Sequence, residues 1–136
     1  MKVIRKHFDI FRQECIRWVR FFGLKEWKIN AVRRLDETLF EEERALGKCA
    51  ADPQSRVADF VIDADWGEIR VTTELLELCA FHEVCELLLF KLAKMAEVQY
   101  SKAVVEEEVH VIVRKLENSI FLAYKRHKNK MEKSKE

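Results

Sequence analysis

Proline and glycine are nearly absent from this sequence, whose 136 residues include only 1 Pro and 3 Gly. Such a composition excludes a collagen-like or low-complexity chain, and no Pro/Gly/Ser-rich linker divides the sequence into domains. No apolar run approaches the roughly 20 residues that a membrane-spanning helix needs. Charges interrupt the first residues throughout, so they do not resemble a signal peptide. We therefore expect one soluble, cytoplasmic domain that does not bind a membrane.

The sequence also lacks an excess of charge of either sign. It has 25 Lys and Arg residues and 24 Asp and Glu residues, for a net charge of +1. No overall field favours nucleic acid, so a DNA-associated accessory role and a nucleic-acid partner are not expected. The sequence from Tyr124 to Glu136 is a local exception, "YKRHKNKMEKSKE". We interpret residues 128–136 as a basic, solvated and disordered tail that follows a single domain of residues 1–127.

The four cysteines show no CxxC spacing, which favours reduced thiols over a disulfide framework or a zinc ribbon. Cys79 and Cys85 flank a histidine on a predicted helix and could ligate a soft metal. The alternative, which we prefer, is that both are small buried residues.

Apolar periodicity predicts an α+β domain with an N-terminal helix, a small three-stranded, mainly antiparallel sheet and two C-terminal helices. Gly23 ends the first helix, Pro53 marks a turn, and Thr72 or Thr73 caps the long helix. The expected helices cover residues 3–22, 73–96 and 102–127, and the expected strands lie within 24–35, 45–52 and 56–66, with a charged turn at 36–44.

The stretch "AFHEVCELLL" places His82 and Glu86 one turn apart on an otherwise apolar helix face. A buried carboxylate is costly without a partner, so this face requires a compensating group. A divalent cation would satisfy it, with Glu83 standing beside the ion as a general base. A plain His–Glu hydrogen bond would satisfy it too, and the spacing alone leaves both interpretations open.

A metal site would need a third protein ligand, and "VEEEVHVIVRKLEN" on the last helix offers one. Its polar face at helical spacing consists of Glu106, His110, Arg114 and Glu117. Directed at His82 and Glu86, this face makes His110 the third ligand. Glu106 or Glu107 is then a reserve ligand or a hydrogen-bond partner of a ligand. Arg114 orients a metal-bound carboxylate. The alternative is a solvated face with intrahelical Glu–His and Arg–Glu pairs, each worth a few tenths of a kcal/mol.

The order of elements and the motifs "FHEVCELLL" and "EEEVHVIVRKLEN" resemble the small zincin-type metallopeptidase domains, of minimal gluzincin or SprT-like type, that phages and prophages carry. The resemblance is to a subset with HExxE in place of HExxH. It implies a phage- or prophage-encoded zinc hydrolase in which His82, Glu86 and His110 bind zinc and Glu83 is the catalytic base. The carboxylate ligand also admits manganese or another divalent metal.

This resemblance implies a metallopeptidase that cleaves peptide bonds with metal-activated water, so its partner would be a peptide or protein substrate. The alternative is a catalytically inactive zincin-like module that binds a host or phage protein. The strand "RVADFVID" would pair with an extended peptide if it forms the exposed edge of the sheet.

Overall fold

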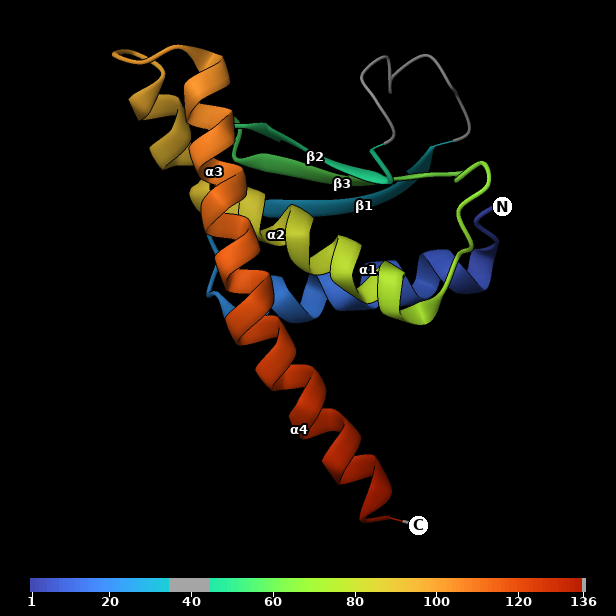
Figure 1. Ribbon diagram of the computed structural model, residues 1–136. Coiled ribbons are helices and arrows are strands. Elements are labelled where there is room, and N and C mark those ends of the chain that lie inside the picture. Colours follow the sequence, from blue (N-terminus) through green and yellow to red (C-terminus); the bar gives the residue numbers. More distant parts are fainter. Residues whose placement is uncertain (35–44, 136) are drawn as a thin grey trace.

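The computed structural model describes residues 1–34 and 45–135, and the charged turn expected at 36–44 lies outside the described residues. One mixed sheet and four helices make up the described fold, as Figure 1 shows. The helices α1 (Arg5–Phe21) and α2 (Thr73–Ala96) pack against each other and against the sheet, while α3 (Lys102–Leu116) packs against α2. The expected α+β class is therefore confirmed. No helix in these described parts of the chain is long and apolar enough to cross a membrane.

The N-terminal helix α1 is amphipathic, and its inner face contributes Phe11, Cys15 and Trp18 to the core. It ends where the sequence predicts an end. Gly23 adopts a positive φ of 66°, a left-handed conformation that a side chain would disfavour.

The sheet has the order β1-β3-β2, formed by β1 (Lys28–Arg34), β2 (Gly47–Asp52) and β3 (Val57–Asp63). β3 pairs antiparallel with β2 and parallel with β1. The sheet is thus mixed rather than mainly antiparallel. β2 and β3 form a hairpin, so β2 occupies one side of β3 and β1 pairs along the other side. β1 runs in the same direction as β3.

The central position of β3 rules out the peptide-binding role that "RVADFVID" would have had as an exposed edge strand. Its backbone hydrogen-bonding groups are used by neighbours on both sides. The burial of Ala58, Phe60 and Ile62 fits an interior strand. Among the described strands, β2 and β1 form the edges instead.

The hairpin turn before β3 follows the predicted chemistry of "DPQS". The Asp52 carboxylate accepts hydrogen bonds from the Gln54 backbone N–H and the Ser55 hydroxyl, at 3.0 and 2.8 Å. Arg56 completes the turn with a positive φ of 56°.

The long helix α2 begins at the predicted cap, because the Thr72 hydroxyl accepts a hydrogen bond from the Leu75 N–H at 3.2 Å. It contacts α1, α3 and the sheet, so apolar residues occupy most of its circumference. The polar side chains in the middle of this helix, His82, Glu83 and Glu86, therefore lie at interfaces between elements, whereas Glu74 and Lys91 near its ends are exposed.

The C-terminal helix extends further than predicted, since α3 continues through a π-helical turn, η2 (Glu117–Phe121), into α4 (Leu122–Lys133). Residues 128–133 are helical where the sequence suggested a disordered tail. Lys125 and Lys128 both donate hydrogen bonds to the buried Glu77 carboxylate, which anchors this part of α4 to α2. Beyond that anchor, α4 projects away from the rest of the fold (Figure 1).

The π-helical turn keeps two buried side chains in line. Val113 on α3 and Phe121 at the end of η2 both face the core, although eight positions separate them. An α-helix completes two turns in about 7.2 residues, so an unbroken helix would rotate Phe121 away from the core. The wider π turn absorbs the difference.

Aromatic rings join three helices at the centre of the core. Phe81 of α2 lies 4.6 Å from Trp18 of α1 and 5.2 Å from Phe121, between ring centroids. Trp18 has a further edge contact with Phe21, whose side chain is 62% exposed.

We predict that Phe81→Ala will lower the free energy of unfolding by about 3–5 kcal/mol, because it leaves a cavity among fully buried rings. The control Phe21→Ala removes a largely exposed ring and should cost no more than about 1 kcal/mol. Urea denaturation followed by far-UV circular dichroism measures both. Equal losses for the two variants would contradict this account of the core.

Candidate metal centre

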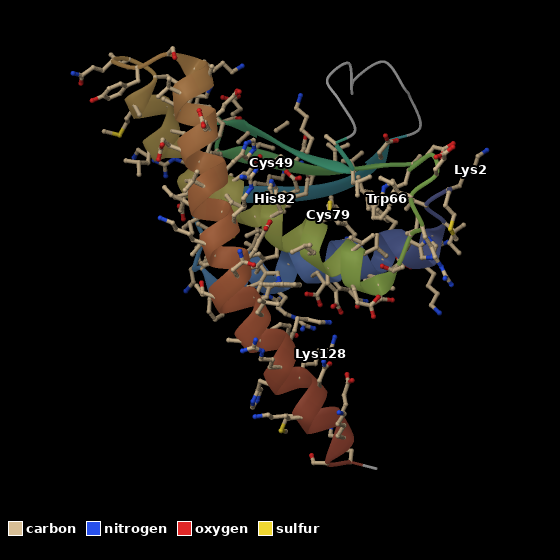
Figure 2. The ribbon with its side chains drawn as sticks, in the orientation of Figure 1. Lys2, Cys49, Trp66, Cys79, His82 and Lys128 are labelled. Carbon is tan, nitrogen blue, oxygen red and sulfur yellow. The ribbon has the colours of Figure 1, made fainter. Side chains whose placement is uncertain are left out.

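The polar face of α2 that carries His82, Glu83 and Glu86 lies beside the first residue of β2. A Cβ atom at Gly47 would stand 2.7 Å from the Cys79 sulfur and 3.4 Å from a Glu83 carboxylate oxygen. The absence of a side chain at Gly47 therefore allows α2 to approach the sheet closely at this point. Figure 2 shows Cys49, Cys79 and His82 in this region between the sheet and the helices.

His82, Glu86 and His110 meet as the sequence predicted. The two imidazoles each place Nε2 beside the same carboxylate oxygen, Glu86 Oε1, at 3.3 Å from His82 and 3.2 Å from His110. One ligand atom from each residue lies within 4.8 Å of the other two. Residues from two helices thus converge on one point.

Two of the three donor-to-donor distances are compatible with a tetrahedral ion. Two ligands bound about 2.0–2.2 Å from zinc in tetrahedral geometry are about 3.3–3.5 Å apart. The two nitrogen-to-oxygen distances measured here fall at the short end of that range or just below it. Two imidazoles and one carboxylate are also a known catalytic zinc set that leaves a position open. The residues present fit the metal, and the same atoms can hydrogen-bond to one another without it.

Glu117 is a site residue whose role the sequence reasoning missed. Its Oε1 lies 2.7 Å from His82 Nδ1, so one ring nitrogen of His82 is held while Nε2 is left to face Glu86 and His110. A carboxylate behind a histidine ligand fixes the ring orientation and its tautomer. Helical spacing alone pairs Glu117 with Arg114. The sequence feature that could have identified Glu117 as a site residue is its position two turns after His110 on the same helix.

The Glu83 side chain lines the same cleft, but it is only 5% exposed and turns toward β2. The Cys49 backbone N–H donates a hydrogen bond to the carboxylate, while Oε2 has no hydrogen-bond partner among the described residues. Burial, with the nearby negative charge of Glu86, raises the pKa of Glu83 to about 8. With this raised pKa, the Glu83 carboxyl favours its protonated form, and Oε2, which has no partner among the described residues, can carry the proton.

Opposite charges of His82 and Glu86 face each other in the rest of the cluster. The hydrogen bond from His82 to Glu86 raises the pKa of His82 to about 9, against the effect of partial burial. Burial opposes ionisation of Glu86, but hydrogen bonds and the charges of His82 and His110 prevail and lower its pKa. Without a metal, the pair is an imidazolium bound to a carboxylate.

The three expected auxiliary residues do not reach this cluster. Glu106 pairs with Lys102 at 3.6 Å along α3, and the side chains of Glu106, Glu107 and Arg114 are exposed. None of the three is among the residues that line the cleft. Their expected ligand and orienting roles therefore have no support in the geometry.

The cysteines beside the cluster are protonated thiols. Burial raises the pKa of Cys85 to about 12 and raises that of Cys79 well above its ordinary value. Cys85 is fully buried in the core, as expected, whereas Cys79 lines the cleft next to Gly47. Both act as small packing residues here.

A cleft of about 660 Å³ opens around the cluster, between the start of β2 and the facing surfaces of α2 and α3. His82, Glu83, Glu86, His110 and Glu117 all line it. The His110 side chain is 48% exposed, so the point where the donors meet is accessible from solvent.

Comparisons with known proteins leave the family open, because no family, no curated protein and no solved structure matches the chain significantly. The function is accordingly argued from the geometry of the site.

We predict that the stability difference between wild type and Glu83→Gln in metal-free protein depends on pH. The raised pKa means that folding favours protonated Glu83, so its contribution is full below about 4.5 and is lost as the pH rises through about 8. Glu83→Gln cannot ionise and should become progressively more stable than wild type over this interval. Urea denaturation in the presence of a chelator measures the difference.

Glu106→Gln is the matched control, because that carboxylate lies on the surface of α3 and pairs only with Lys102, at 3.6 Å, among the described residues. Its stability relative to wild type should not follow the same rise. A pH-independent difference for Glu83→Gln would contradict the burial-driven shift in the pKa of Glu83.

Proposed function

We propose that this protein is a zincin-like metallopeptidase that binds one zinc ion through His82, Glu86 and His110 and hydrolyses peptide bonds. The observation that carries the proposal is the convergence of these three donors from α2 and α3 in an open cleft, with the buried Glu83 carboxyl beside them. A structural zinc site usually closes its coordination with a fourth protein ligand, whereas the described part of the chain brings only these three donors together.

Each residue of the cluster has a distinct task in this proposal. The imidazoles of His82 and His110 and the carboxylate of Glu86 hold the ion, and Glu117 keeps the His82 ring in place through Nδ1. A bound divalent ion supplies Lewis acidity, which lowers the pKa of water and polarises a carbonyl. Glu83 accepts a proton at its carboxylate and returns it to the leaving amine.

The pKa of Glu83, about 8 in the metal-free protein, also bears on this task. A positive ion near the carboxylate favours its ionised form, so binding of zinc would lower the pKa toward the range of a useful base. The group would then be ready to take a proton only when the metal is present.

Substrate would enter along β2, the edge strand that contributes Gly47 and Lys48 to the cleft. Backbone pairing with an edge strand binds an extended peptide with little demand on its side chains. This assigns to β2 the role that the sequence suggested for the central strand β3.

A second candidate is a non-catalytic zincin-like module that binds another protein. The observation in its favour is the deep burial of Glu83 against β2, where it is hydrogen-bonded to Cys49 rather than directed at the three donors. Wild-type protein that carries zinc but cleaves no peptide would favour this candidate.

We predict that purified protein will hold one zinc ion and that His110→Ala and Glu86→Ala will each lose it. Glu117→Gln should weaken zinc binding by about 10–100-fold, since it removes the charge that orients His82. Elemental analysis and competition with a chromophoric chelator measure both. Glu106→Ala, one turn from His110, is the control and should keep its zinc. If the wild-type protein holds no metal after incubation with zinc or manganese, the proposed site is refuted.

We predict that Glu83→Gln will retain zinc and lower kcat for peptide hydrolysis by about 10²–10⁴-fold, because the side chain can no longer carry the proton. Zinc content and turnover of an unstructured protein substrate should be measured on the same preparations. Full turnover in this variant would show that Glu83 is not the base.

A further inference from the structure

The edge of β2 that faces away from β3 presents backbone groups of three residues. The Asp63 N–H donates a hydrogen bond to the Leu46 carbonyl oxygen at 3.0 Å, and the register of the two strands places these residues opposite each other. Because hydrogen-bonded pairs alternate along an antiparallel ladder, every second residue from Leu46 onward directs its N–H and C=O at β3. The residues of β2 that face outward instead are Gly47, Cys49 and Ala51.

The central N–H of this outer edge is already occupied by a side chain. The Cys49 N–H donates its hydrogen bond to the Glu83 carboxyl group, which reaches it from α2. The close approach at Gly47 makes this possible, because a Cβ atom there would stand 3.4 Å from a Glu83 oxygen. Glu83 therefore lies against the strand edge, although it lines the same cleft as His82 and His110.

An extended peptide that pairs with β2 requires the same N–H. Strand addition joins the outward N–H and C=O groups of an edge strand to the main chain of the ligand. A single N–H donates along one direction, so a peptide carbonyl that accepts from Cys49 would stand where the Glu83 carboxyl group stands. Peptide and Glu83 consequently compete for the middle of the edge.

The contact of Glu83 with the strand is poorly satisfied. The side chain is only 5% exposed, and Oε2 has no hydrogen-bond partner among the described residues. A buried acceptor without a partner raises the free energy of the folded protein. Exchange of Glu83 for a peptide carbonyl preserves the hydrogen bond of Cys49 and releases this carboxyl group. Rotation about side-chain bonds is sufficient for the movement.

We infer that Glu83 occupies the Cys49 N–H in the free protein and that an extended peptide displaces it when it pairs with β2. The released carboxyl group can then turn toward His82, Glu86 and His110. The base thus reaches its working position only when substrate is bound. The inference rests on the proposed function, because it takes a peptide to be the substrate. It also explains the burial of Glu83 against β2 without requiring a non-catalytic protein.

Peptide affinity of two Glu83 variants tests the displacement. NMR titration of the isotope-labelled whole chain in a chelator, where no metal is present for hydrolysis, measures it with a blocked peptide of about ten alternating Thr and Ser residues. Glu83→Ala leaves the Cys49 N–H free and should bind this peptide about 3–10-fold more tightly than wild type, the effect of one hydrogen bond. Glu83→Gln retains a carbonyl oxygen for that N–H and should bind like wild type. The control Glu106→Ala removes an exposed carboxylate of α3 and should leave the affinity unchanged.

The wild-type titration provides a second measurement. The backbone amide resonance of Cys49 and the carboxyl carbon resonance of Glu83 should shift together as the peptide binds, because both groups change their partner. A Cys49 resonance that the peptide leaves unchanged would overturn the inference. Glu83→Ala that binds no more tightly than wild type, or equal gains for Glu83→Ala and Glu83→Gln, would overturn it as well.

The outcomes also separate this inference from the proposed activity. Peptide hydrolysis by the zinc-loaded wild type, together with a Cys49 resonance that does not respond to peptide, would support the peptidase and overturn the displacement. The expected affinities and shifts, in a protein that cleaves no peptide with zinc bound, would support the displacement and refute the peptidase.

Discussion

The close approach of α2 to the edge of the sheet at Gly47 is the contact on which the arrangement of the site depends. It brings Glu83 against the Cys49 backbone and leaves His82 and Glu86 facing α3. A side chain at position 47 would meet the Cys79 sulfur and the Val61 carbonyl oxygen, and it would push helix and strand apart. The burial of Glu83 follows from this contact, and the cleft opens beside it.

Hydrogen bonds within the protein hold the side chains of the donor cluster against one another. His82 is held between two carboxylates, Glu86 and Glu117, and His110 shares the same Glu86 oxygen. Burying these groups costs desolvation energy, which the mutual hydrogen bonds offset. These contacts fix the ring orientations, which is what a preorganised site would require if the proposed ion binds there. Glu83 is the exception, since one of its oxygens finds no partner among the described residues.

Much of the fold, and three of the site residues, could be predicted from local patterns. The ends of α1 and α2 follow from Gly23 and Thr72, and the convergence of His82, Glu86 and His110 follows from helical spacing on two facing helices. Strand order could not be predicted, because β3 has the same apolar alternation whether it is central or at an edge. The hydrogen bonds from Glu117 to His82 and from Lys128 to Glu77 join residues distant in sequence, which spacing along one helix does not reveal.

The π-helical turn makes the helix sensitive to the direction of a change in chain length. His110, Glu117 and Lys125 belong to one continuous helix and contact α2 at three separate points. Deleting one residue from η2 would remove the extra residue that the wider turn accommodates, so a regular α-helix would keep Lys125 on the side of Glu77. Inserting one residue would instead rotate everything after it by about 100° relative to α3 and would separate Lys125 from Glu77. Insertions in this segment are consequently far less tolerable than deletions.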